Sequence, residues 1–153
     1  MYTLFLLKSI HQLTDEGRAA YIVPSEFLNA DYGTTIKKLM LVNKMLRYVI
    51  LFNPNHSIFD QALTTTCILL FANDSHTIHT TFINIESIEQ LSELTAQVSM
   101  YPNSMAAGRT VRHAELNYDV KWRAYYQHTN NRNYKNVVPL STYGKVMRGI
   151  ATG

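Results

Sequence analysis

The chain has 153 residues, of which 46% are hydrophobic and 16% are charged, and its formal net charge is +3. This composition excludes an intrinsically disordered chain, and the length suffices for one hydrophobic core. Because charged residues or threonines interrupt every apolar stretch, we expect no membrane span of about 20 residues and a cytoplasmic location. The single cysteine, Cys67, excludes an internal disulfide and is interpreted as a core residue rather than a nucleophile.

The first predicted elements are an amphipathic helix and a short strand. Residues 15–17 end the helix in a turn, and its apolar residues recur at helical spacing: Leu4, Leu7, Ile10 and Leu13. Residues 19–23 are continuously apolar and are followed by Pro24. This pattern is typical of a strand buried on both faces, as in a parallel sheet.

A second helix and a second strand follow. From Gly33 onward, one helix face is predicted to carry Ile36, Leu39, Met40 and Asn43, and the solvent side is predicted to carry Lys37, Lys38 and Lys44. Residues 48–52 indicate another buried strand. Since this helix is long enough to connect parallel strands, we predict a right-handed βαβ unit over residues 18–52.

The next connection, residues 53–62, contains no helical pattern, so the strand at 63–71 is predicted to return antiparallel. Residues 76–85 alternate as a strand, and Ser87 is expected to cap a following helix. Residues 101–136 show little periodicity and are interpreted as linker and surface. The predicted fold class is therefore α/β, with parallel strands that end in an antiparallel hairpin and an appended α+β segment.

Several short patterns occur in a fixed order along residues 2–73. Residues 2–5 begin a helix, residues 17–24 read Gly-x-x-x-x-Ile-Val-Pro, and Ile58-Phe59 precedes the Thr-rich strand. Together they resemble the second half of the catalytic domain in gamma-class adenine-N6 DNA methyltransferases of restriction-modification systems. The ending Gly149-Ile150-Ala151-Thr152-Gly153 is similar to the segment in which these enzymes enter their target-recognition domain.

The resemblance implies a division of the chain into three parts. Residues 1–75 would be the C-terminal half of a Rossmann-like methyltransferase domain, 76–136 an appended strand, helix and linker, and 137–153 the start of a truncated target-recognition domain. The complete enzyme would transfer a methyl group from S-adenosylmethionine to adenine N6. The family's glycine-rich cofactor loop and its Asn/Asp-Pro-Pro-Tyr/Phe motif are not in this sequence, so we expect the chain alone to bind no cofactor and to be inactive.

Phe59 is the candidate base-stacking residue. A base must leave the duplex to be methylated, and a flipped base is held by aromatic and apolar side chains. The resemblance implies that an aromatic at this position stacks on the flipped adenine. The alternative is that Phe59 only closes the core. Asn53-Pro54 is interpreted as an ordinary turn, because a second proline is missing.

The C-terminal third is basic, which makes it a candidate surface for double-stranded DNA. The residues predicted to bind DNA are Arg109, Arg112, Arg123, Lys145 and Arg148. Tyr125, Tyr126 and Tyr134 interleave with them, as on surfaces that stack bases. A merely solvated basic face is an equal alternative. Trp122 is interpreted as an anchor of the linker rather than a stacking residue.

Other chemistries have little support. The six histidines have no metal-ligand spacing, so no metal is expected. Ser25 lacks the flanking glycines of an exposed nucleophile and is interpreted as a helix or turn cap.

A sheet without its first strands would expose an apolar edge strand, which predicts pairing with the missing N-terminal half or with a second copy. The alternative function is a non-catalytic DNA-binding or interaction module. Such a module would bind DNA in a salt-sensitive way without binding the cofactor.

Overall fold

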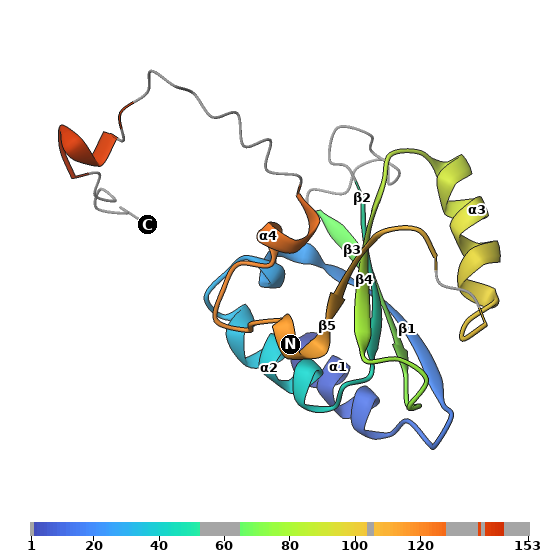
Figure 1. The fold of residues 1–153 in the computed structure, drawn as a ribbon. Helices are drawn as coiled ribbons and strands as arrows, with labels where there is room; N and C mark the ends of the chain where they lie inside the picture. The colour runs from blue at the N-terminus through green and yellow to red at the C-terminus, as the bar shows by residue number, and fades with distance from the viewer. Residues whose placement is uncertain (1, 53–64, 104–105, 128–137, 139, 146–153) are drawn as a thin grey trace.

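The computed structural model describes residues 2–52, 65–103, 106–127, 138 and 140–145, and it arranges them in three layers (Figure 1). The helices α1 (Tyr2–His11) and α2 (Gly33–Val42) cover one face of a central sheet, and α3 (Ile88–Ser99) covers the other. The short helices are η1 (Ser25–Leu28), η2 (His113–Glu115), α4 (Arg123–Tyr126) and η3 (Leu140–Thr142). None of the described helices is long and apolar enough to cross a membrane.

The sheet has the strand order β1-β3-β2-β4-β5. The strands are β1 (Arg18–Pro24), β2 (Leu46–Phe52), β3 (Thr66–Ala72), β4 (His79–Ile85) and β5 (Arg109–Arg112). The predicted antiparallel return is confirmed, because β3 runs antiparallel to both β1 and β2. The α/β class is also confirmed, although only the β2–β4 pairing is parallel among the described strands. The two strands of the predicted βαβ unit run in the same direction, with β3 between them.

The strand predicted to be buried on both faces, β1, lies at the edge of the described sheet. It pairs with β3, and its residues alternate between exposed and part-buried up to Val23. Ile22 is 64% exposed. The expectation of two buried faces is therefore wrong for this chain, because neither a further strand nor a helix covers β1 on the α3 side within the described residues.

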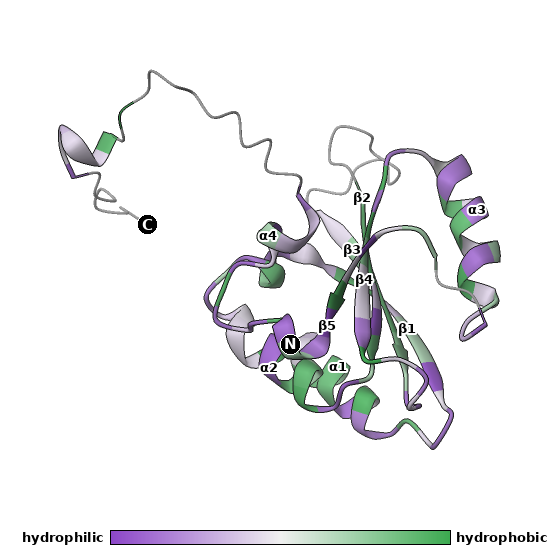
Figure 2. Cartoon of the chain, viewed as in Figure 1, coloured by the Kyte–Doolittle hydropathy of each residue, from purple (hydrophilic) through white to green (hydrophobic). Residues whose placement is uncertain are grey.

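Two apolar cores fill the spaces between the layers, and Figure 2 shows hydrophobic residues along β2 and β3 and on α1. The first core lies under α1 and α2 and includes Leu6, Ile36, Leu69 and Trp122. The second lies under α3 and includes Tyr48, Ile83, Leu94 and Tyr101. The predicted cap of α3 is confirmed, since the Ser87 hydroxyl accepts from the Gln90 backbone N–H at 3.4 Å.

The region after residue 75 is part of the central sheet and its core, and is not merely appended to them as the sequence indicated. The strand predicted at 76–85 is β4, which pairs with β2 and so continues the sheet. Within the predicted linker, β5 adds a further strand and Trp122 is fully buried. The interpretation of 101–136 as linker and surface is thus wrong for its described first part, and the divisions at residues 75 and 136 stay predictions.

Lys37 was predicted to face solvent but is buried. Its ammonium donates to the carbonyl oxygen of Val120 at 2.8 Å and lies 3.5 Å from that of Leu28. Burial lowers the pKa of Lys37, while the nearby Asp119 and Asp31 carboxylates oppose that shift. Helical periodicity could not reveal this burial, because the covering segment lies about 80 residues further along the chain.

A buried ion pair ties β2 to the turn before β4. Arg47 donates to the carboxylate of Asp74 at 3.0 Å and to the hydroxyl of Tyr101 at 2.9 Å, and both charged side chains are 2% exposed. Tyr101 in turn donates to the same Asp74 oxygen at 2.9 Å. Burial would raise the pKa of Asp74, but the hydrogen bonds from Tyr101 and Arg47 outweigh it and hold that pKa below its usual value.

Replacing Arg47 by Met tests this pair. Arg47→Met leaves the Asp74 carboxylate buried without its cation, so we expect the free energy of unfolding to fall by about 3–5 kcal/mol in urea titrations. The control Lys8→Met removes an exposed cation from α1 and should change stability by no more than about 0.5 kcal/mol. A loss below about 1 kcal/mol in Arg47→Met would show that the pair contributes little.

Gly33 allows α2 to lie against η1. A Cβ atom at this position would lie 1.7 Å from the carbonyl oxygen of Phe27, a backbone atom that cannot move alone. We therefore expect Gly33→Ala to cost about 3 kcal/mol or more in the same titrations. Gly144→Ala is the matched control, because a Cβ there would meet nothing within 4 Å. Equal stability of the two variants would contradict the close approach.

Candidate functional site

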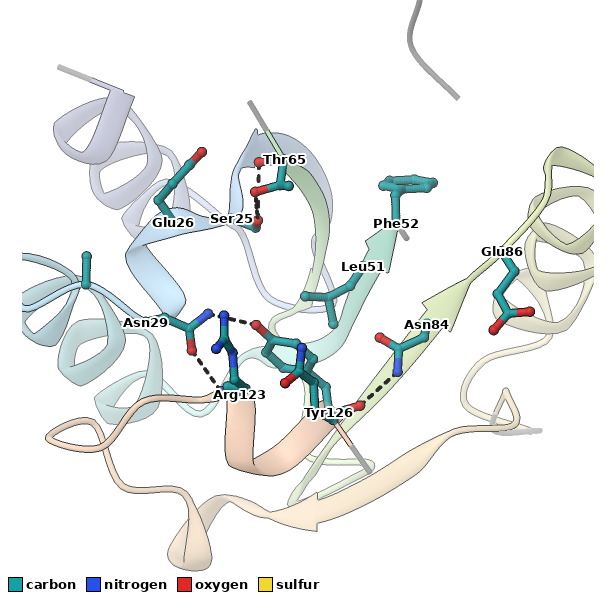
Figure 3. Close-up of a pocket in the computed structure, with 12 residues that line it drawn as sticks. Ser25, Glu26, Asn29, Leu51, Phe52, Thr65, Asn84, Glu86, Arg123 and Tyr126 are labelled. Atoms are coloured by element: carbon teal, nitrogen blue, oxygen red, sulfur yellow. Dashed lines mark hydrogen bonds between the residues drawn. The ribbon is translucent and has the colours of Figure 1, made fainter. Parts of the chain in front are cut away.

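A cleft of about 690 Å³ opens where β1, β2 and β4 end (Figure 3). These three strands run in the same direction, so their carboxyl ends meet at one edge of the sheet. Ligands of open α/β sheets bind at this edge. The cleft is lined by Ser25, Glu26, Asn29, Ala30, Leu51, Phe52, Thr65, Asn84, Glu86, Arg123, Tyr126 and Gln127.

One wall of the cleft is the turn between β1 and α2. Ser25 follows the last residue of β1, and its hydroxyl donates to the Thr65 hydroxyl at 2.9 Å. Its backbone N–H also donates to the Thr65 carbonyl oxygen at 2.9 Å. Ser25 makes no side-chain cap of η1, so its interpretation as a cap is wrong: its hydroxyl is used to hold the start of β3 against the end of β1.

The opposite wall comes from residues 123–127. The side-chain amide of Asn29 is hydrogen-bonded at both ends, since its Nδ2 donates to the Tyr126 hydroxyl at 2.7 Å and its Oδ1 accepts from the Arg123 backbone N–H at 2.9 Å. From β4, Asn84 Nδ2 donates to the Tyr126 carbonyl oxygen at 2.8 Å. Figure 3 shows these side chains converging on α4. The cleft is therefore assembled from five separate stretches of sequence.

The lining suits binding better than nucleophilic catalysis. It offers amide, hydroxyl and carboxylate groups, the Arg123 guanidinium and the rings of Phe52 and Tyr126, but none of its described residues is a histidine, cysteine or lysine. The Ser25 hydroxyl is occupied by Thr65. Such a surface can pair with the polar edges of a planar ligand and pack against its faces.

The predicted DNA-binding residues are brought together only in part. Arg123 lines the cleft, whereas Arg109 donates to the Ala124 carbonyl oxygen at 2.8 Å and so braces α4. Arg109 and Arg112 are both exposed but lie three apart on β5, so they point to opposite faces. Lys145 is exposed, and Arg148 and Phe59 lie outside the described residues.

The tyrosines near Arg123 are part of the packing. Tyr125 stacks on Phe82 with ring centroids 5.8 Å apart, and the Tyr126 hydroxyl is held by Asn29. Tyr134 lies outside the described residues. Trp122 is an anchor, as predicted, because it is fully buried and meets Phe82 edge to face. Sequence reasoning missed Asn29 and Asn84, although their places near the ends of predicted strands were an available signal.

The cysteine and one histidine lie in surroundings that explain their roles. The Cys67 thiol is fully buried, and burial raises its pKa to about 12, which fits the predicted core role. His76 lies beside Glu16 and Asp74, with one ligand atom from each within 4.8 Å of the others. The Asp74 carboxylate already accepts from Arg47 and Tyr101, so a cation at this position would compete with a buried ion pair.

Comparison with known proteins relates the whole chain to restriction-modification enzymes. The family model described as Eco57I restriction-modification methylase matches residues 1–59. The type II methyltransferase M.AccI of Acinetobacter calcoaceticus is 50% identical over all 153 residues, and the chain spans 28% of that protein's length. The type II restriction enzyme and methyltransferase RM.Eco57I of Escherichia coli is 36% identical over 75 residues, which are 49% of this chain and 7% of that protein.

Solved structures agree on the fold. The methyltransferase subunit of a type I restriction-modification system from Streptococcus thermophilus matches with a TM-score of 0.60 and 17% identity, over 81% of this chain and 30% of that one. The type IIG restriction endonuclease BpuSI matches with a TM-score of 0.58 and 18% identity, over 80% of this chain and 15% of that one. The chain is thus a relative of type II restriction-modification methyltransferases, with 50% identity to M.AccI along all 153 residues, which span 28% of that protein.

Proposed function

We propose that this chain supplies the target-base side and part of the DNA-contacting surface of a methyltransferase that transfers a methyl group from S-adenosylmethionine to adenine N6 in double-stranded DNA. The observation that carries the proposal is the 50% identity to M.AccI along the entire chain. The cleft at the carboxyl ends of the strands supports it, because this is where such a sheet would receive a flipped base.

The chemistry of the cleft suits a nucleobase. Asn84 and Glu86 carry polar groups of the kind that read the edge of a base, and Phe52 and Tyr126 provide flat apolar surface. Phe59 belongs to the segment that leaves β2 after Phe52 and rejoins the described chain at Thr65. Both flanking residues line the cleft. This position supports the proposal that Phe59 stacks on the flipped adenine.

The described residues of the cleft include no glycine-rich cradle for the cofactor. Close approach to S-adenosylmethionine calls for a glycine-rich turn after a strand, and the described glycines Gly17, Gly33, Gly108 and Gly144 are all absent from the cleft lining. We therefore assign no cofactor contact and no catalytic residue to these residues. Methyl transfer also requires donor and amine to be held together, so the chain alone would be inactive.

The remainder of the methyltransferase domain is the proposed partner, with a second copy as the competing one. The β1 edge pairs with no further described strand, and Ile22 beside it is exposed. The helix α1, which contacts β1, exposes Leu4 and Phe5, which are 72% and 69% accessible. An open edge flanked by apolar side chains favours association with another strand. DNA contacts are proposed for Arg109, Arg112, Arg123, Lys145 and Arg148.

The first test separates binding from catalysis in the purified chain. We expect duplex DNA to bind with an affinity that falls steeply with salt, while calorimetry with S-adenosylmethionine gives no binding heat and tritium transfer to unmethylated DNA is absent. Adding the complementary part of the methyltransferase should restore transfer. Transfer by the chain alone would contradict the proposal, and DNA binding without any restored transfer would favour a non-catalytic binding module.

The second test concerns Phe59 in a longer protein that also contains the cofactor motifs. Losing one stacking ring in Phe59→Ala should weaken binding of the flipped base by about 1–3 kcal/mol. A fluorescent base analogue at the target position would report this loss. Phe59→Tyr keeps the ring and should retain flipping. Unchanged flipping and turnover in Phe59→Ala would instead assign Phe59 to the core.

A further inference from the structure

Residues 117–127 are fastened to the turn between β1 and α2 by a set of directed hydrogen bonds. The Leu28 carbonyl oxygen accepts from the Trp122 backbone N–H at 2.9 Å, and Asn29 accepts from the next residue, Arg123, at 2.9 Å. Asn29 also donates to the Tyr126 hydroxyl. Two neighbouring residues of the turn thus hold the backbone of α4 at its first residue and the side chain of its last.

Lys37 adds a second attachment three residues before Arg123. Its ammonium is buried and donates to the Val120 carbonyl oxygen at 2.8 Å. An apolar side chain of similar length would fill the same space without the cost of burying a charge. What only the lysine provides is a donor that holds the Val120 carbonyl in place.

Trp122 completes the attachment from the core side. It is fully buried between Phe82 and Tyr125, and its indole N–H donates to the Asn117 carbonyl oxygen at 2.9 Å. The backbone of the next residue, Arg123, is therefore held in a fixed position. The burial of Trp122 also makes it a reporter of this arrangement, because it is the chain's single tryptophan.

The side chain that this scaffold presents to the cleft is the guanidinium of Arg123. It is exposed and, within the described part of the chain, has no hydrogen-bond partner, in contrast to Arg109, which is bonded to Ala124. Glu26 and Glu86 line other parts of the same cleft. An anionic group of a ligand would therefore be met at the Arg123 side, away from the carboxylates.

We infer that Asn29 is a positioning residue, which holds Arg123 at the rim of the cleft so that its guanidinium contacts a backbone phosphate of the DNA strand that enters it. Lys37 supports the same segment from below. This inference rests on the proposed function for the identity of the ligand. It goes beyond that function because Asn29 acts indirectly: it fixes the backbone of Arg123, whose side chain contacts the phosphate, and Asn29 itself touches no DNA.

A double-mutant cycle on DNA affinity in the 153-residue chain tests the inference. Arg123→Ala should weaken binding about tenfold and lower the slope of log affinity against log salt by about 1. Asn29→Ala should weaken binding in the same direction, and the double variant should lose no more than Arg123→Ala alone. Asn29→Asp keeps the acceptor for the Arg123 N–H and replaces the Nδ2 donor by an oxygen to which the Tyr126 hydroxyl can donate, so it should bind DNA more tightly than Asn29→Ala. Asn103→Ala, at an exposed turn, is the control.

Quenching of Trp122 fluorescence by acrylamide gives a readout that does not depend on DNA. Asn29→Ala should increase quenching because the segment loosens, whereas Arg123→Ala should leave it unchanged. Unchanged quenching in Asn29→Ala, or losses of affinity that add in the double variant, would overturn the positioning role. If the unmodified chain shows no salt-sensitive DNA binding, both the phosphate contact and the proposed function are wrong. The quenching result still decides whether Asn29 holds residues 117–127.

Discussion

The arrangement of the molecule depends on the hydrogen-bonded ladders that place β3 between β1 and β2. Because β3 runs opposite to both neighbours, β1 and β2 are left parallel, and β4 then joins β2 in the same direction. Three carboxyl ends are thereby brought to one edge, and the residues at or just after these ends supply Ser25, Phe52 and Glu86 to a common cleft. A slip of β3 by one residue would exchange its two faces and separate Thr65 from Ser25.

The apolar composition of β1 is explained by a neighbouring strand that is missing from its outer edge among the described residues. A strand of this apolar character is typical of a sheet interior, yet here it forms the edge and leaves Ile22 exposed. A solvent-exposed edge in natural proteins usually carries charges, proline or a bulge that discourages pairing. Arg18 and Pro24 stand only at the two ends of β1, so its middle is suited to a neighbour. This mismatch between sequence and surroundings agrees with a chain that spans 28% of the length of M.AccI.

The helices, strands and caps that depend on neighbouring residues could be predicted from the sequence. The contacts between residues far apart in the chain could not. Periodicity located α1, α2, α3 and most of the strands, and Ser87 was correctly identified as a cap. Lys37 was misplaced because its partner at Val120 is 83 residues away, and Ser25 because its partner at Thr65 is 40 residues away. The apolar residues of 113–127 do not recur at a helical or strand spacing, because this segment is held in place by individual contacts such as those of Trp122. No local pattern encodes such contacts.

The position of the cleft follows from the sheet topology, whereas its walls depend on contacts between distant residues. The carboxyl ends of parallel strands follow from topology, so a site after β2 was predictable. The wall opposite comes from α4, a helix of four residues whose position is set by Asn29, Leu28 and Asn84 rather than by its own sequence. A short helix has little intrinsic stability. Its location therefore depends on the surrounding hydrogen bonds. Substitutions in the turn after β1 would act on the position of Arg123, which lies 94 residues later in the chain.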